Sequence, residues 1–170
     1  MMAELRETAI VLARADRLEP IAYGDAIGAA RVIERTEEGR ADVPATRRSA
    51  WLSANVGYLA GALELGLEMT LAHTKARVAF GRPLAALDSV QQRLAEVATA
   101  ADGLRLLSLG RSDGEALAYA AMAAEEELAA CHQLTGAIGF TLEYPLQRAL
   151  RRARSMRVWS EAIAHEGAGP

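Results

Sequence analysis

A row of leucine and valine residues spaced three or four apart constrains the fold of this chain more than any other feature. The row consists of Leu52, Val56, Leu59, Leu63, Leu67 and Leu71. Side chains at this spacing lie on one face of an α-helix, because the helix completes a turn every 3.6 residues. The pattern predicts a long amphipathic helix with Thr46 as its N-cap, and Pro83 marks the point by which it must have ended.

The same apolar periodicity recurs in three later segments. It predicts helices over about 88–107, 115–134 and 145–166, separated by short glycine-containing turns. Four amphipathic helices with short connections predict an all-α, up-down-up-down four-helix bundle over residues 46–166. The tail at 167–170 is expected to fray.

Residues 1–45 differ from the rest of the chain. Short apolar runs at 10–12 and 31–33 are interrupted by proline, glycine and a charged stretch at 34–42. This composition predicts a short irregular or β N-terminal segment, with two or three short strands at most. We expect such a segment to be too short to form a stable sheet alone.

Composition and charge exclude several classes of protein. With 51% hydrophobic and 24% charged residues, the 170-residue chain is typical of a soluble globular domain. A net charge of −3 and only 5% aromatic residues argue against nucleic-acid binding. No apolar run reaches the roughly 18 residues that a membrane span requires, and the N-terminus does not look like a signal peptide. A cytoplasmic location is therefore the expectation.

Few residue groups in the sequence point to chemistry by themselves. His73, His132 and His165 lack metal-ligand spacing, so no metal site is expected. Cys131 and His132 are neighbours, and neighbours on a helix point about 100° apart, so Cys131 is interpreted as a core residue. Four arginines lie close together in the last predicted helix: Arg148, Arg151, Arg152 and Arg154. They form either a phosphate-binding cluster or a solvated basic face.

Two segments together resemble a known family. Ala76–Leu84, followed by Val90–Glu96, is similar to the "YxxxRxxFGxPL…vQ…LAD" stretch of acyl-CoA dehydrogenases. Gln133–Pro145 is similar to the family's "QxxGGxGFxxEYP", and Arg148–Arg154 resembles its "R…RDAR" helix. The resemblance covers roughly residues 46–165, which correspond to the C-terminal helical domain of those enzymes.

The resemblance implies a cofactor and an assembly. Acyl-CoA dehydrogenases use FAD to oxidise the Cα–Cβ bond of an acyl-CoA thioester. Their subunits carry an N-terminal helical domain, a middle β-domain and this C-terminal bundle, which drives dimer and tetramer assembly. Residues 1–45 would then be a remnant of the middle β-domain.

The resemblance also assigns residues to FAD. Arg77 and Phe80 match residues that contact the cofactor across a subunit interface. Gln133, Gly136 and Gly139 match residues that line its ADP half. Arginine suits a pyrophosphate, and the amides of a helix end suit an anion.

Four departures from the family pattern weaken the expectation of independent catalysis. The family's catalytic glutamate position falls on Ser160, and a hydroxyl cannot remove an α-proton as a carboxylate does. Glu161 is one residue away, so the catalytic residue stays unknown. Asp88 replaces a glutamine near the pyrophosphate, and Ala137 replaces a glycine. The chain also has no room for the family's other domains. We therefore expect FAD binding by the isolated chain to be weak or absent.

Three interpretations remain open. The chain is an oligomerising subunit of acyl-thioester or polyketide-type metabolism, paired with itself or with a fuller acyl-CoA dehydrogenase-like subunit. Alternatively, a partner subunit completes an active FAD-dependent acyl-CoA oxidoreductase. A third interpretation is a stand-alone cyclase, dehydratase or isomerase that binds an acyl thioester or another hydrophobic small molecule. Its cavity between the helices would be lined by Trp51, Tyr58, Met69, Tyr119 and Trp159.

Overall fold

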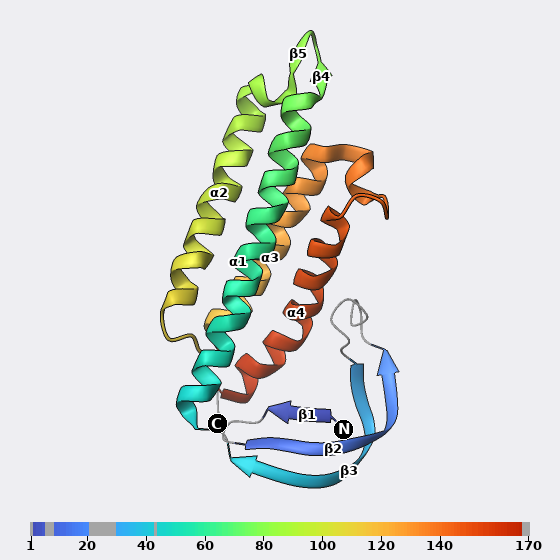
Figure 1. Ribbon diagram of the computed structural model, residues 1–170, viewed down its shortest axis with the longest axis vertical. Helices are drawn as coiled ribbons and strands as arrows, with labels where there is room; N and C mark the ends of the chain where they lie inside the picture. Colours follow the sequence, from blue (N-terminus) through green and yellow to red (C-terminus); the bar gives the residue numbers. More distant parts are fainter. Residues whose placement is uncertain (1, 6–8, 21–29, 43, 168–170) are drawn as a thin grey trace.

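In the part of the chain that the structure describes, four long helices form an antiparallel bundle, which confirms the predicted all-α architecture (Figure 1). The helices are α1 (Ala45–Ala76), α2 (Asp88–Leu109), α3 (Gly114–Thr135) and α4 (Leu146–Gly167). Each is joined to the next by a short connection, so the order is up-down-up-down. The computed structural model describes residues 2–5, 9–20, 30–42 and 44–167.

The described residues of the N-terminal segment form three strands, β1 (Met2–Leu5), β2 (Ala9–Pro20) and β3 (Ala30–Asp42). They form an antiparallel sheet in the order β1-β2-β3. With 12 and 13 residues, β2 and β3 are longer than the short strands predicted. The register of their pairing shifts at three places. Such shifts interrupt the alternation of apolar and polar residues by which a long strand is recognised in a sequence.

The interior of the bundle is filled by aliphatic side chains from all four helices. From the leucine row, Leu52, Val56, Leu59 and Leu63 are buried, as the spacing predicts. Leu67 and Leu71 are only half-buried. The last three members of the row are four residues apart, and each such step rotates the side chain about 40° beyond a full turn. The row therefore drifts out of the core near the end of α1.

Two connections lie at the same end of the bundle, because α1 and α3 run in the same direction (Figure 1). The α1–α2 connection is a hairpin of β4 (Val78–Ala79) and β5 (Arg82–Pro83), followed by the 3₁₀ turn η2 (Leu84–Ala86). The α3–α4 connection contains the 3₁₀ turn η3 (Gly136–Phe140).

Backbone geometry decides where the helices begin and end. Pro44 is the N-cap of α1 and gives no side-chain cap, so the predicted cap at Thr46 is wrong. The first residue of α2 is Asp88, with Leu87 before it. The side chain of Asp113 caps α3 by accepting a hydrogen bond from the Ala116 amide at 2.8 Å. α3 ends at Gly136, whose φ of +65° favours glycine.

The three glycines of α1 differ in what a side chain at each position would meet. A Cβ at Gly66 would meet the side chain of Leu128, and one at Gly57 would meet the side chain of Ser108. At Gly61 a Cβ would meet nothing within 4 Å. Among these three glycines of α1, only Gly66 is therefore required by packing.

Candidate functional site

The tip of the β4–β5 hairpin holds an aromatic side chain in an unusual conformation. Phe80 has a φ of +53° and Gly81 one of +77°, so both residues of the turn are left-handed. The left-handed region costs a residue with a side chain about 1–2 kcal/mol. The ring of Phe80 is also 90% exposed. A strained, exposed phenylalanine is unfavourable for the isolated fold, and residues of this kind gather at binding sites.

Two cations flank this ring. Arg77 follows the last residue of α1, and its backbone is fixed on both sides. Its amide donates to the His73 carbonyl and its carbonyl accepts from the Leu84 amide, both at 2.8 Å. The side chains of Arg77 and Arg82 are exposed and have no hydrogen-bond or ion-pair partner among the described residues. This short stretch of the chain thus carries two exposed arginines, without a partner among the described residues, and an exposed ring. The combination suits an anionic, partly aromatic ligand.

The α3–α4 connection carries the other residues assigned by the resemblance. Gln133 and Gly136 are exposed at the end of α3. Gly139 is buried, and a Cβ there would collide with Thr135 Oγ1 and lie 3.3 Å from His132 Nδ1. Packing inside the connection therefore explains Gly139, whereas Gln133 and Gly136 face outward, where a ligand can reach them.

Neither residue at the family's catalytic position is poised as a base. Ser160 is fully buried, and its hydroxyl donates to the Arg157 carbonyl at 3.1 Å. The exposed carboxylate of Glu161 accepts a hydrogen bond from Arg157 Nε at 3.1 Å. The carboxylate of Glu161 is therefore held at the surface against Arg157.

Cys131 is a core residue, as predicted. It is fully buried, and burial raises the pKa of its thiol, which keeps it protonated and unreactive. The next residue, His132, is also buried, and burial lowers the pKa of its imidazole. The described residues contain no group of three or more His, Cys, Asp or Glu that could hold a metal ion.

The five large residues expected to line one cavity lie in separate places. The rings of Trp51 and Trp159 are 5.5 Å apart, between α1 and α4. Tyr58 lies in a groove between α1 and α4, and Tyr119 in a groove between α2 and α3. The backbone carbonyl of Met69 accepts a hydrogen bond from the Tyr144 hydroxyl. Aliphatic side chains fill the space between the helices, so the expected cavity does not form from these residues.

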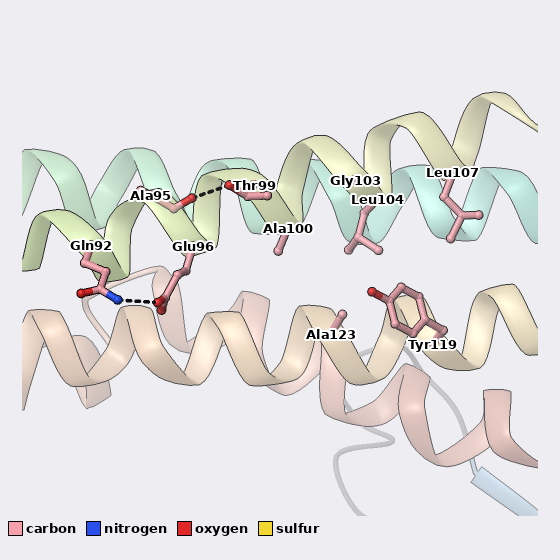
Figure 2. A pocket seen from close by; sticks show the side chains of 10 residues that line it. All are labelled: Gln92, Ala95, Glu96, Thr99, Ala100, Gly103, Leu104, Leu107, Tyr119 and Ala123. Atoms are coloured by element: carbon pink, nitrogen blue, oxygen red, sulfur yellow. Dashed lines mark hydrogen bonds between the residues drawn. The ribbon is translucent and has the colours of Figure 1, made fainter. Parts of the chain in front are cut away.

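The groove between α2 and α3 has a volume of about 720 Å³ and is lined mainly by small and apolar residues (Figure 2). Tyr119 reaches toward α2 opposite Gly103 and Leu104, as Figure 2 shows. At the other end, Glu96 accepts hydrogen bonds from Gln92 and from Arg93. The groove offers an apolar surface rather than a set of reactive groups.

The described helices include none that is both long and apolar enough to cross a membrane.

Comparison with known proteins supports the resemblance. Residues 53–114 match the model of a family described as acyl-CoA dehydrogenase, C-terminal domain. An acyl-CoA dehydrogenase of Bacillus subtilis (strain 168) is 30% identical over 128 residues, which cover 65% of this chain and 34% of that protein. The chain spans about a third of the length of the curated relatives that it matches.

Solved structures share the fold. The acyl-CoA dehydrogenase of Geobacillus kaustophilus superposes with a TM-score of 0.67 at 20% identity, over 93% of this chain and 50% of that one. A chain of the ChsE4-ChsE5 complex of Mycobacterium tuberculosis gives a TM-score of 0.63 at 18% identity, over 95% of this chain and 53% of that one. These structures show the fold, and the family match over residues 53–114 together with the curated relatives identifies the helical part of this chain as a C-terminal domain of the acyl-CoA dehydrogenase type.

Proposed function

We propose that this chain is the helical part of an acyl-CoA dehydrogenase-type assembly and contributes Arg77 and Phe80 to an FAD site. The rest of that site comes from another subunit. The observation that carries the proposal is Phe80, which is 90% exposed in a left-handed conformation between two unpaired arginines. Such a ring gains most by contact with a planar ligand whose phosphates reach the neighbouring cations.

The residues at this end of the bundle fit parts of FAD. The guanidinium groups of Arg77 and Arg82 suit a pyrophosphate, and Gly136 leaves the end of α3 accessible to the ADP half. Asp88 is exposed at the start of α2, and its negative charge would repel an anion bound close to it. FAD, when bound, supplies the two-electron oxidation of an acyl thioester. The residues described here hold and orient the cofactor.

The catalytic base of such an assembly must come from elsewhere. Ser160 is buried and bonded to a backbone carbonyl, and Glu161 is paired with Arg157. The Ser160 hydroxyl is not a carboxylate, and the Glu161 carboxylate lies at the surface against Arg157. We therefore propose that this chain does not oxidise acyl-CoA by itself, and that a partner subunit provides the carboxylate.

The N-terminal strands fit the same proposal. The overlap with the Geobacillus kaustophilus enzyme covers 93% of this chain, which is more than residues 45–167 can account for, so it extends into the sheet. We propose that residues 1–45 correspond to part of a middle β-domain and residues 46–166 to the bundle. The ChsE4-ChsE5 structure supports assembly with a second kind of chain, since this fold occurs there in a complex.

The test is the flavin content of the protein purified from its own host. The tagged wild-type chain is expected to co-purify with FAD bound to its assembly, measured by absorbance and released-flavin fluorescence. Phe80→Ala and Arg77→Ala are each expected to lower the FAD-to-protein ratio at least threefold, because each removes a direct contact.

Arg105→Ala is the matched control, since Arg105 is an exposed arginine on α2, remote from the hairpin. Its flavin content should equal that of the wild type. A colourless wild-type assembly, or equal flavin content in all four proteins, contradicts the proposal.

A further inference from the structure

We propose a second ligand site in the groove between α1 and α4, which binds an organic anion with an apolar body. The head group is a carboxylate or a phosphate ester, and Arg148, Arg152 and Tyr58 hold it. The site is separate from the hairpin residues assigned to FAD.

The groove exists because α4 packs mainly against α3 and leaves its α1-facing side partly open. It has a volume of about 480 Å³, which is in the range of small-molecule sites. Small side chains keep it open, and Leu65 at its wall is 51% exposed. Its apolar lining comes from Gly61, Ala62, Leu65, Pro145 and Ala149. An aliphatic chain placed there would bury apolar surface that is now in water.

The polar lining consists of hydrogen-bond donors. Arg152 Nη1 donates to the Tyr58 hydroxyl at 2.7 Å, and its guanidinium carbon lies 5.9 Å from the centre of the Tyr58 ring. This contact holds the Arg152 head group at the groove wall instead of in bulk solvent. Because the Tyr58 oxygen accepts that bond, its own proton stays available for another acceptor.

The positive charge in the groove is not neutralised. Among the described residues, no carboxylate lines the groove, and the Arg148 side chain has no ion-pair partner. Arg148 and Arg152 are four residues apart on α4 and share one face, so their charges repel. The opposite side of α4 differs, because Arg154 and Arg157 both pair with Glu125 at 3.2 and 3.0 Å. The arginines facing α3 are thus neutralised, and those facing α1 are left for an external anion.

The groove has both an apolar lining and a set of hydrogen-bond donors, and together they determine which ligand fits. Free phosphate would satisfy the donors and leave the apolar lining in water, whereas an aliphatic alcohol would do the reverse. A medium-chain carboxylate satisfies both. We therefore expect the affinity to depend on the anion and on the chain together.

Calorimetric titration of the purified 170-residue chain tests this, with octanoate, acetate, inorganic phosphate and octan-1-ol as probes. Octanoate is expected to bind once per chain, at least tenfold more tightly than any other probe. Arg148→Gln and Arg152→Gln should each weaken octanoate binding about tenfold. Tyr58→Phe should weaken it about threefold. The exposed Arg105→Gln on α2 is the control and should bind as the wild type does.

The opposite results are equally specific. The proposal is overturned if octanoate does not bind at 5 mM, if both arginine variants bind normally, or if phosphate binds as tightly as octanoate. Circular dichroism checks that each variant is folded. Leu65→Asn should weaken the binding of octanoate but not the binding of phosphate. Arg148→Gln should keep the flavin content of the native assembly, so failure here and failure of the FAD proposal are distinguishable.

Discussion

Gly66 on α1 lies directly against Leu128 on α3: a Cβ at Gly66 would be 2.5 Å from Leu128 Cδ2. Leu128 is fully buried and cannot move freely. Gly66→Ala should therefore destabilise the protein by about 1–2 kcal/mol, since overpacking outweighs the gain in helix propensity. Urea unfolding measures this. Gly103→Ala on α2, where a Cβ meets nothing within 4 Å, should instead stabilise by about 0.5–1 kcal/mol. Equal stability of the two variants would show that the contact is not restrictive.

Glu125 joins α3 to α4 through two arginines, with Arg154 at 3.2 Å and Arg157 at 3.0 Å. Glu125→Gln should lower the melting temperature by about 2–4 °C in dilute buffer, because Arg154 and Arg157 each lose one carboxylate partner. The difference should shrink in 1 M NaCl, where the screening length is about 3 Å. Glu126→Gln, an exposed neighbour on α3, serves as the control. A loss that is independent of salt would contradict an ionic origin.

The buried imidazole of His132 should make stability depend on pH. Burial lowers its pKa, with a further contribution from the charge of Arg154, and an interaction with the Leu146 backbone only partly offsets this. In the unfolded chain the pKa is about 6.5. As the pH falls below about 6.5, the unfolded chain binds a proton that the folded chain does not, so stability falls until the folded pKa is passed.

Urea unfolding between pH 7.5 and 5 measures this dependence. His132→Leu should reduce it, because the replacement cannot titrate. Glu127 has the opposite influence, since burial raises the pKa of its carboxyl and stability gains as the pH falls toward that value. Glu127 is present in both the wild type and His132→Leu, so the difference in pH dependence between these two proteins excludes its contribution. An unchanged pH dependence in that variant would exclude His132 as its source.

Phe80 should show a conflict between stability and function. Phe80→Asn is expected to raise the stability of the isolated chain by about 0.5–1 kcal/mol, because asparagine tolerates the left-handed region better. The same change should lower the flavin content of the native assembly. Thermal unfolding and flavin content, measured on one preparation, check both effects. A destabilised variant would mean that the ring packs on the fold itself.

The sequence predicted the helical architecture well because apolar periodicity is a local property. The spacing of Leu52, Val56, Leu59 and Leu63 was enough to identify the buried face of α1. The family motifs placed Arg77 and Phe80 on the α1–α2 connection and Gln133 and Gly136 at the end of α3. The exposure of these residues was not predictable, since it depends on which elements cover each connection.

Other features needed the packed bundle. The sequence does not distinguish an aromatic residue that lines a cavity from one that lies at a surface groove. The structure places Trp51, Tyr58 and Tyr119 in separate positions. Gly139 was assigned to a cofactor, and its contact with Thr135 gives it a packing role. The four arginines of α4 were indistinguishable in sequence. The rotation of α4 decided that Arg154 meets Glu125 while Arg152 meets Tyr58.

By itself, the order of apolar and polar residues determined that this chain forms four amphipathic helices, because each helix needs only its own 3.6-residue repeat. Tertiary structure alone decided which charges are paired, which glycines are required and where grooves remain. Those properties depend on side chains far apart in sequence, such as Gly66 with Leu128 and Tyr58 with Arg152, and they exist only once the helices have packed.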